Sequence, residues 1–445
     1  MKVSIIGAGY VGLVTGVCLA ETGHQAICVD VDKEKVGKIN QAIPPIHEEG
    51  LAEFLRKNVP VRLKATTDLH QSVVETDITF IAVGTPFDGN QIDLSYVREA
   101  SKQIGESLKD KQVFHLVVVK STVVPGTTDG VVLPILEQTS GKKAGLDFGV
   151  SMNPEFLTEG QAMLDFMNPD RIILGGTDER SMNMLEQLYA AFEDTPKLRT
   201  NTRTAEMIKY ASNAMLATQI SFANEMANLC SALGGVDIVD VMRGVHLSHY
   251  LSPKTLDGKR IQAPISSFLE SGCGFGGSCL PKDVKALIAH GEGVGCPMPL
   301  LRAVIETNER QPQQVMKLLR RHFDSLRNTR IAVLGLSFKP DTDDMRESPA
   351  IPIIRELLAQ GANLKAFDPA ANKEARKLFK DEKFVLSDTL EDALSNVDAV
   401  VLVTRWEHFR DIPQILEKVN SKALFVDGRR MLDKRSIARY EGIGL

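Results

Sequence analysis

The sequence contains little of what membrane proteins, secreted proteins or nucleic-acid-coating proteins need. No apolar run approaches the ~20 residues that span a bilayer. The net charge of -5 is not the basic excess of a protein that coats nucleic acid. A strand opens at Val3 and a glycine-rich turn follows it, which is not the pattern of a signal peptide. We therefore expect a cytoplasmic protein without a membrane or nucleic-acid partner.

Cysteine pairs of the CxxC type are also absent, although the chain has six cysteines. Their scatter argues against a zinc site or a disulfide framework, and we expect no bound metal. Unpaired cysteine is typical of a reducing compartment. The six residues are Cys18, Cys28, Cys230, Cys273, Cys279 and Cys296.

The 445 residues are too many for one hydrophobic core, and the length favours roughly three domains. Short apolar segments alternate with helical patterns up to about residue 175, which predicts a doubly wound α/β sheet. We expect these segments to be buried parallel strands. They are Val3–Ile6, Ala26–Val29, Ile78–Val83, Val113–Val119 and Ile172–Leu174.

A second α/β unit opens at Arg330 with the apolar segment Ile331–Leu334. Its next strand, near Leu364–Phe367, is followed by Asp368, as the strand Ala26–Val29 is followed by Asp30. This is a weak internal repeat. Because Gly335–Lys339 lacks the glycine spacing of the first turn, we expect the second unit to bind a different ligand.

Residues 204–233 contain no Pro or Gly and predict one long helix with Thr204 as its N-cap. Such a helix suits a domain connector or a dimer interface, although an ordinary core helix explains its apolar face equally well. Lys209 and Asn213 are four residues apart and share one helix face. They are suited to stabilising an oxyanion, but taken alone they are better explained as a solvated polar stripe.

A glycine-rich turn, Gly7–Gly12, lies between a predicted strand and a predicted helix. Gly7 permits the tight turn, Gly9 lets a pyrophosphate approach the backbone, and Gly12 lets the helix pack on the strand. Asp30 follows the second strand, where an acid binds a ribose 2′-hydroxyl and repels a 2′-phosphate. The turn therefore predicts NAD rather than NADP, and a glycine turn without a ligand is a minor alternative.

Three further polar segments follow predicted strands, where open parallel sheets bind their ligands. Gly84–Pro86 and Lys120–Thr122 are each, taken alone, better explained as ordinary turns. Asn153–Gly160 is a polar loop with two acids, Glu155 and Glu159. A solvated helix start explains this loop equally well.

The most specific motif is Gly274–Asp283, which overlaps the end of a loop-rich segment, Leu247–Gly277. Cys279 precedes a helix predicted to start near Pro281, and Lys282 lies close by. A helix N-terminus and a neighbouring lysine both favour the thiolate, the nucleophilic form. Asp283 is close enough in sequence to act as a base. The other five cysteines lack this setting and are interpreted as small core residues.

Two polar segments follow strands of the second α/β unit. They are Lys339–Pro349 and Asp427–Arg430. Arginine suits bidentate phosphate contacts, so these segments favour a phosphate-bearing ligand, although surface arginines are common.

Taken together, these motifs resemble the UDP-glucose/GDP-mannose dehydrogenase family over nearly the whole chain. They occur in the family's order: GxGYVG, GTP, KST, NPEFLxEG, the AEMIKYASNA helix, GFGGSCLPKD, FKPxTDDxRESP and DGRR. The resemblance implies two Rossmann-like doubly wound domains joined by a long central helix. It implies an NAD domain over residues 1–200, a central dimerisation domain over 201–305 and a nucleotide-sugar domain over 306–445.

The resemblance also implies residue roles. Cys279 would be the nucleophile, Lys209 and Asn213 would stabilise charge on the sugar oxygen, and Asp283, Glu155 and Thr122 would handle protons and water. The cofactor set is Gly7, Gly9, Tyr10, Val11, Gly12, Asp30, Lys35, Thr85, Thr122, Glu159, Lys282 and Arg346. The substrate set is Glu155, Phe156, Leu157, Lys209, Asn213, Arg260, Phe268, Gly276, Phe338, Lys339 and an arginine of the Arg429–Arg430 pair.

The implied reaction is a four-electron oxidation of a nucleotide sugar through a thiohemiacetal and a thioester on cysteine. UDP-glucose is the preferred substrate, with GDP-mannose and UDP-N-acetylhexosamines as alternatives, because Ile261–Pro264 departs from the usual UDP-glucose pattern. A homodimer or larger oligomer is implied. Two other classes stay open: a single-step dehydrogenase of the 3-hydroxyacid type, and a non-enzymatic NAD-sensing protein.

Overall fold

The computed structural model describes residues 1–445 and divides into two compact units. Unit 1 comprises Met1–Ser212 and unit 2 comprises Asn213–Leu445. No helix combines the length and the apolar character needed to cross a membrane.

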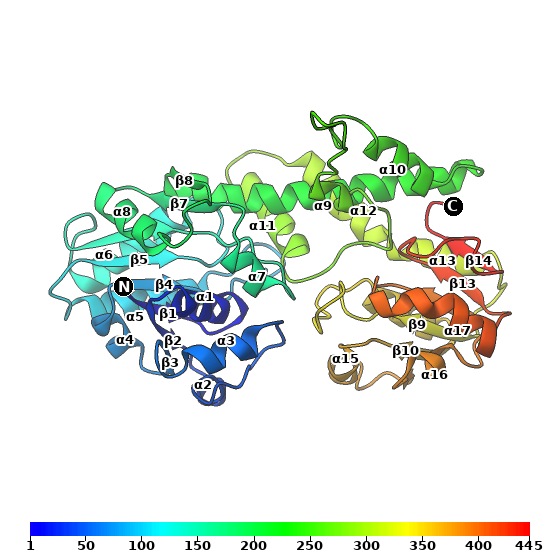
Figure 1. The fold of residues 1–445 in the computed structure, drawn as a ribbon, viewed down its shortest axis with the longest axis horizontal. Helices are drawn as coiled ribbons and strands as arrows, with labels where there is room; N and C mark the ends of the chain where they lie inside the picture. Colours follow the sequence, from blue (N-terminus) through cyan, green and yellow to red (C-terminus); the bar gives the residue numbers. More distant parts are fainter. The chain divides into compact units, whose positions relative to one another are not determined.

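Unit 1 contains an eight-stranded sheet in the order β3-β2-β1-β4-β5-β6-β7-β8 (Figure 1). Strands β2 and β3 are added on one side of β1, and β4 and β5 on the other, so the strand order switches sides at β1, as in doubly wound folds. The strands are β1 (Lys2–Ile6), β2 (Gln25–Val29), β3 (Leu63–Thr66), β4 (Ile78–Ile81), β5 (His115–Val119), β6 (Phe148–Met152), β7 (Ile172–Gly176) and β8 (Lys197–Thr200).

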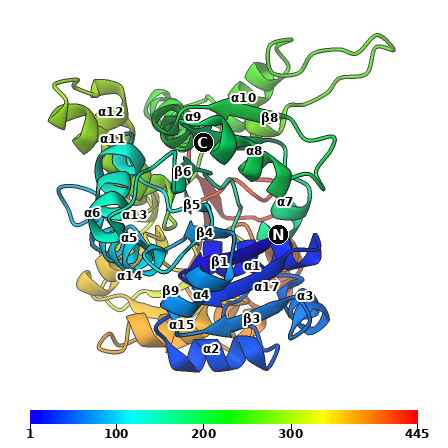
Figure 2. The same cartoon turned by 90° about the vertical axis from the view of Figure 1, so that its left-hand side faces the viewer.

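Helices cover both faces of this sheet. They are α1 (Tyr10–Glu21), α2 (Lys33–Asn40), α3 (Leu51–Asn58), α4 (Leu69–Glu75), α5 (Ser95–Leu108), α6 (Leu133–Ser140), α7 (Ala162–Met167) and α8 (Glu179–Leu188). In Figure 2, α5 and α6 lie on one side of β4 and β5, and α3 and α7 lie on the other. Neighbouring side chains of β1 alternate between the two faces, since Ile5 packs with α1 and α3 whereas Ile6 packs with α5 and α6. Burial on both faces explains why these strands are apolar throughout.

One strand direction was predicted wrongly. The segment Ile172–Leu174 is β-structure, but β7 pairs with β6 in the antiparallel sense, with Met152 opposite Gly175. The loop after β6 and the short helix α7 return the chain into the sheet at the edge where β6 ends. The apolar run alone carries no information about strand direction, because a buried antiparallel strand has the same composition.

Unit 2 contains a six-stranded, all-parallel sheet in the order β11-β10-β9-β12-β13-β14. Its strands are β9 (Arg330–Leu334), β10 (Asn363–Phe367), β11 (Val385–Leu386), β12 (Ala399–Leu402), β13 (Leu424–Asp427) and β14 (Tyr440–Gly442). The sheet confirms the predicted second α/β unit. Val333 packs with α13 (Pro312–Arg320) and α14 (Ala350–Ala359) on one face. Leu334 packs with α16 (Leu390–Leu394) and α17 (Ile412–Val419) on the other.

The remaining helices of unit 2 are α10 (Ile238–His246), α11 (Leu280–Gly293), α12 (Pro299–Arg310) and α15 (Asn372–Leu378). The predicted long helix is α9 (Thr202–Leu233), which runs across the boundary of the two units. Its predicted N-cap is wrong. The helix begins two residues earlier, and the Asn201 side-chain oxygen accepts the backbone N–H of Thr204 at 2.8 Å. Asn201 is therefore the N-cap, and Thr204 lies in the first turn.

This capping assignment predicts different effects for two neighbouring substitutions. Asn201→Ala should lower the free energy of unfolding by about 1 kcal/mol, because a helix donor loses its partner. Thr204→Ala should have little effect, because its exposed side chain caps nothing. Urea denaturation followed by circular dichroism measures both, and a larger loss for Thr204→Ala would contradict the assignment.

Candidate active-site residues

The glycine turn of unit 1 is shaped for a dinucleotide. Gly7 has φ +97°, and a Cβ there would lie 2.8 Å from the Ala82 carbonyl oxygen. A Cβ on Gly12 would lie 1.8 Å from the Gly7 carbonyl oxygen, so the first turn of α1 packs directly on the strand end. Gly9, the residue before α1, has nothing within 4 Å of such a Cβ. The backbone at Gly9 therefore borders open space at a helix N-terminus, which fits a pyrophosphate.

Asp30 lies beside this turn with its carboxylate held in place. It accepts the backbone N–H of Ala8 at 3.0 Å and pairs with the Lys35 ammonium at 2.8 Å. Partial burial works to raise the pKa of Asp30, but Lys35 and the backbone N–H groups of Asp32 and Ala8 outweigh it and hold this pKa below its usual value. Asp30 is therefore ionised at neutral pH and suits a ribose hydroxyl, while Lys35 is already its ion-pair partner.

Tyr10 and Val11 open helix α1, and the Tyr10 side chain has a partner within the fold. Its hydroxyl donates to the Glu48 carboxylate and accepts the backbone N–H of Gly160 at 3.0 Å. Glu48 also accepts the N–H groups of Gly160 and Ala162. Burial, followed by the bond to Glu48, raises the pKa of Tyr10, so the phenol stays protonated. Tyr10 therefore ties the end of the 153–160 loop to the start of α1.

The GTP and KST segments meet at the carboxyl edge of β4 and β5. The Thr85 hydroxyl donates to the Thr122 carbonyl oxygen at 2.7 Å, and the Ser121 hydroxyl donates to the Val83 carbonyl oxygen at 2.7 Å. The two segments are hydrogen-bonded to each other rather than independent turns. Thr122, whose carbonyl oxygen accepts the bond from Thr85, is half-buried.

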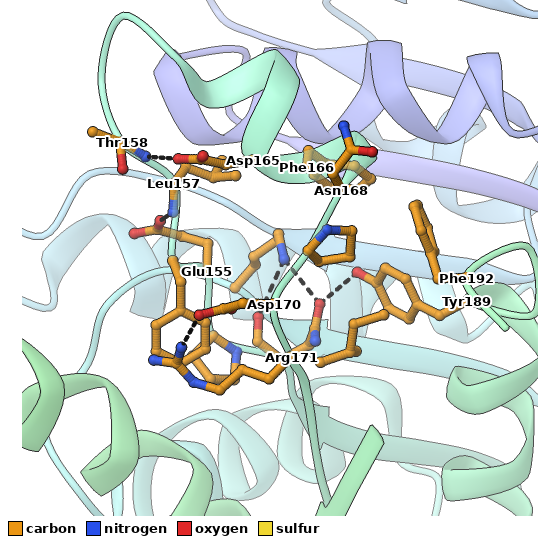
Figure 3. A pocket seen from close by; sticks show the side chains of 16 residues that line it. Glu155, Leu157, Thr158, Asp165, Phe166, Asn168, Asp170, Arg171, Tyr189 and Phe192 are labelled. Atoms are coloured by element: carbon orange, nitrogen blue, oxygen red, sulfur yellow. Dashed lines mark hydrogen bonds and ion pairs between the residues drawn. The ribbon is translucent and has the colours of Figure 1, made fainter. Parts of the chain in front are cut away.

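The loop Asn153–Gly160 carries a buried ion pair at this edge of the sheet. The Glu155 carboxylate lies 3.0 Å from the Lys209 ammonium, and the two side chains are only 6% and 5% exposed. Leu157 donates its backbone N–H to Glu155 at 2.7 Å (Figure 3). Burial works to raise the pKa of Glu155, but Lys209, the Leu157 N–H and Lys120 outweigh it and lower this pKa. Glu155 is therefore an ionised, buried carboxylate.

This burial corrects two sequence-based interpretations. The loop is not a solvated helix start, since α7 begins only at Ala162. Lys209 and Asn213 are not a solvated stripe, since both are buried. Phe156 covers the ion pair from one side, and the Arg171 guanidinium stacks on its ring at 3.8 Å from the centroid. Further along the loop, Thr158 is exposed and Glu159 is half-buried.

Unit 2 holds the cysteine motif. Cys279 is exposed and is the N-cap of α11, and the helix starts at Leu280, close to the predicted start near Pro281. One turn along the helix, the buried Asp283 carboxylate accepts a hydrogen bond from the Asn213 side-chain amide at 2.6 Å. The Lys282 ammonium lies 2.6 Å from the other oxygen of Asp283. The structure therefore brings Asn213 of α9 together with Lys282 and Asp283 of α11, the helix that Cys279 begins.

One of the other cysteines was misinterpreted. Cys18, Cys28, Cys230 and Cys273 are buried, but Cys296 is exposed. It follows Gly295, whose φ of +77° ends α11, and its N–H bonds the Gly291 carbonyl oxygen at 2.7 Å. This is the Schellman arrangement of a helix C-terminus, in which Cys296 is the second residue after the cap.

Phe338, predicted for the substrate, and Arg346, predicted for the cofactor, lie next to the glycines before Cys279. A Cβ on Gly276 would lie 2.3 Å from the Glu347 carbonyl oxygen, and one on Gly277 would lie 2.7 Å from the Phe338 ring. Gly277 also donates its N–H to the Arg346 carbonyl oxygen at 2.9 Å. The cysteine loop and the Lys339–Pro349 segment therefore contact each other. The Arg346 guanidinium faces Asp344, at 2.6 Å.

The structure distinguishes the two arginines of the DGRR segment. Arg430 forms a buried ion pair with Asp237 at 2.8 Å, with 5% and 11% of the side chains exposed. Arg429 is half-buried, and its guanidinium lies against Gly272, where a Cβ would come within 2.8 Å. Arg260 is exposed and donates to the Leu247 and Ser252 carbonyl oxygens. Phe268 is half-buried in a 3-10 turn, Pro264–Phe268.

Sequence reasoning missed two basic side chains at these edges. Arg405, which follows β12, donates to the Arg429 carbonyl oxygen and to Glu270. Burial, followed by the charge of Arg429, lowers the pKa of Arg405 to about 10. Lys120 was seen only as part of the KST turn, yet its ammonium is buried. In both cases the position of the basic residue after an apolar strand could have marked it as a candidate site residue.

Family models match three consecutive parts of the chain. The NAD binding domain of the UDP-glucose/GDP-mannose dehydrogenase family matches residues 1–193, its central domain matches 203–310, and its UDP binding domain matches 332–434. With the glycine turn and Asp30, these matches define an NAD-dependent dehydrogenase.

Whole-chain relatives agree with these matches. UDP-glucose 6-dehydrogenase AglM of Haloferax volcanii is 41% identical, with both chains covered completely. GDP-mannose 6-dehydrogenase of Pseudomonas savastanoi pv. phaseolicola is 38% identical, with 92% of each chain covered. The solved UDP-glucose dehydrogenase of Pyrobaculum islandicum is 39% identical with a TM-score of 0.90, covering 100% of this chain and 97% of that one. The chain belongs to the UDP-glucose/GDP-mannose dehydrogenase family, as its motifs predicted, and is an NAD-dependent nucleotide-sugar 6-dehydrogenase.

Two glycines test how the turn of unit 1 works. Gly9→Ala should leave the melting temperature unchanged and weaken NADH binding, because the added methyl group enters the space that borders the helix N-terminus. Gly12→Ala should lower the melting temperature, because its methyl group collides with the Gly7 carbonyl. Thermal melting and NADH fluorescence titration measure both effects. Wild-type NADH affinity in Gly9→Ala would contradict this placement of the pyrophosphate.

Proposed function

We propose that the chain oxidises UDP-glucose to UDP-glucuronate in two successive two-electron steps through a covalent bond to Cys279. The observation that carries the proposal is an exposed thiol at the N-terminus of α11, one turn before a buried carboxylate held by Asn213 and Lys282. The helix N-terminus and the nearby ammonium favour the thiolate. The relatives named UDP-glucose 6-dehydrogenase support the choice of sugar.

The reaction balances with one sugar, two NAD and one water. Bound NAD supplies the acceptor for each hydride. Loss of the first hydride and the hydroxyl proton turns the C6 alcohol into an aldehyde. The Cys279 thiolate then adds to the carbonyl carbon to form a thiohemiacetal, and loss of a second hydride leaves a thioester. Water cleaves the C–S bond, which releases the carboxylate and the thiol. Covalent capture keeps the aldehyde from escaping between the two oxidations.

Charged and polar side chains are assigned to the proton and charge changes of these steps. Lys209 and Asn213 would donate to the oxygen on C6 when it carries negative charge. Asp283 would accept a proton from the attacking water, with Asn213 and Lys282 holding its carboxylate. Glu155 would assist as acid or base, or through an ordered water, and Thr122 would position that water.

The proposed binding residues fall into a set for NAD and a set for the nucleotide sugar. NAD would lie along Gly7, Gly9 and Gly12, with Tyr10 and Val11 contributing the start of α1, and Asp30 and Lys35 at the adenosine ribose. Thr85, Thr122, Glu159, Lys282 and Arg346 would lie along the cofactor. The nucleotide sugar would contact Phe156, Leu157, Arg260, Phe268, Gly276, Phe338 and Lys339. Of the two arginines, we propose Arg429 for the nucleotide, because Arg430 is the buried partner of Asp237.

A homodimer or larger oligomer is also proposed, with an NAD domain over residues 1–200, a central dimerisation domain over 201–305 and a nucleotide-sugar domain over 306–445. Within unit 2, α9 exposes Met215, Phe222, Leu229 and Leu233, by 56%, 47%, 52% and 66%. Their spacing of seven, seven and four residues is that of a helix-packing seam. The cytoplasm is the proposed location, since the unpaired cysteines suit a reducing compartment.

The sugar is tested by counting NADH per nucleotide sugar consumed. UDP-glucose should yield two NADH, and GDP-mannose and UDP-N-acetylhexosamines should yield little. Two NADH with GDP-mannose instead would keep the chemistry and favour the alternative that the relative from Pseudomonas savastanoi supports. One NADH per sugar would rule out the four-electron reaction.

The nucleophile is tested with a pair of exposed cysteines from the same unit. Cys279→Ser should lower kcat by several orders of magnitude, as deletion of a nucleophile does, and should abolish any covalent sugar adduct seen by intact-protein mass spectrometry. Cys296→Ser is the matched control, because Cys296 is equally a surface thiol but caps the C-terminus of α11. Full activity in Cys279→Ser would overturn the thioester route.

A further inference from the structure

Lys120 is a buried cation to which the proposed reaction assigns no role. It follows β5, and only 4% of the residue is exposed. Its ammonium donates to the Asn153 side-chain oxygen at 2.8 Å and lies 3.4 Å from the Asn153 carbonyl oxygen. A buried ammonium is costly unless it is paired and hydrogen-bonded. Both of these acceptors belong to Asn153, the first residue of the loop that carries Glu155.

Asn153 is hydrogen-bonded to three other parts of unit 1: the end of β5, strand β7 and Tyr189, which follows α8. Its side-chain oxygen accepts from Lys120 and from the Tyr189 hydroxyl, the latter at 2.6 Å. Its side-chain amide donates to the Ile173 carbonyl oxygen in β7 at 2.9 Å. Its backbone N–H donates to the Val119 carbonyl oxygen at 2.9 Å. With two donors on its oxygen and its amide bonded, the Asn153 side chain has one orientation.

The fixed residue is two positions before Glu155, and Pro154 between them has a restricted φ. Beyond Glu155, the Leu157 N–H returns to the carboxylate, which closes the turn. The turn Asn153–Leu157 is therefore held at its start by Lys120 and Tyr189 and at its end by Glu155 itself. A shift of Asn153 moves Glu155 relative to Lys209.

Charge links the same groups. Burial lowers the pKa of Lys120 to about 8, with Glu155 opposing this shift and Lys209 adding to it. The Lys120 charge in turn contributes to the lowered pKa of Glu155. Both lysines thus stabilise the Glu155 carboxylate: Lys209 by a direct ion pair, and Lys120 by its charge without direct contact.

We propose that Lys120 is a positioning residue of the reaction: through Asn153 it sets the Asn153–Leu157 turn and so holds Glu155 against Lys209. This inference rests on the proposed function, in which Glu155 and Lys209 act on the sugar. In this proposal Lys120 acts through Asn153 and Glu155 rather than on the sugar itself.

A double-substitution cycle separates positioning from general stability. Lys120→Met keeps the length of the side chain and removes its charge and hydrogen bonds. It should lower kcat by on the order of 10-fold to 100-fold, the size of effect expected from a misplaced reacting group. The KM for NAD should change little. In a Glu155→Gln background, Lys120→Met should cost little more, because its effect is exerted through Glu155. Losses that multiply would overturn the proposal.

Lys111 provides a matched control in the same unit. It is 6% exposed, and its ammonium also donates to carbonyl oxygens, those of Val73, Val74 and Thr76. Lys111→Met should lower the melting temperature as Lys120→Met does, yet leave kcat unchanged. Equal losses of kcat in the two variants would mark Lys120 as structural only.

Hydrogen exchange gives a readout that does not need activity. Amides of residues 153–160 should exchange faster in Lys120→Met and at the wild-type rate in Lys111→Met. If this holds while the wild-type protein oxidises no nucleotide sugar, the proposed function fails and the anchoring of the turn stands. Unchanged exchange in an active enzyme overturns the anchoring alone.

Should Lys120→Met not fold, Tyr189→Phe removes the other donor to Asn153, and the same double-substitution cycle applies with the same criteria.

Discussion

Parallel strand pairing is the constraint on which the polar segments of both units depend. In unit 1, β1, β4, β5 and β6 run in the same direction, so the glycine turn, Thr85, the KST segment and Asn153 all emerge at one edge. Hydrogen bonds between these segments then lock them together, as Thr85 does with Thr122. In unit 2 the same rule brings Phe338, Arg405 and Arg429 to the ends of β9, β12 and β13. The chemistry of each unit begins from this geometry.

Buried charge is the second constraint, because an unpaired ion in a protein interior costs on the order of several kcal/mol. Each buried charged group at these edges has partners. Glu155 has Lys209 and the Leu157 N–H, Lys120 has Asn153, and Asp283 has Asn213 and Lys282. Arg430 has Asp237. Such pairs hold their members in one geometry, which a reaction that moves protons and hydrides needs.

Local patterns predicted what depends on local structure. The glycine spacing of Gly7–Gly12, the position of Asp30 and the start of α11 after Cys279 all follow from a few consecutive residues. Features set by distant residues were not predictable. The direction of β7 depends on how the chain returns from α7. The burial of Lys209 depends on its ion pair with Glu155, which lies 54 residues earlier in the sequence. Arg430 looks like a ligand-binding arginine in the sequence, because nothing local indicates that Asp237 is its partner.

The internal repeat shows how one topology serves two ligands. In both units an acid follows the second strand and bonds the turn after the first. In unit 1, Asp30 accepts only the Ala8 N–H from the turn, and Gly9 borders open space. In unit 2, Asp368 accepts the N–H groups of Leu336 and Ser337 and the indole N–H of Trp406. The donors that would face a pyrophosphate in unit 2 are thus already bonded to a buried carboxylate. We therefore expect the nucleotide that unit 2 is proposed to bind to contact side chains at the strand ends, such as Arg429 and Phe338.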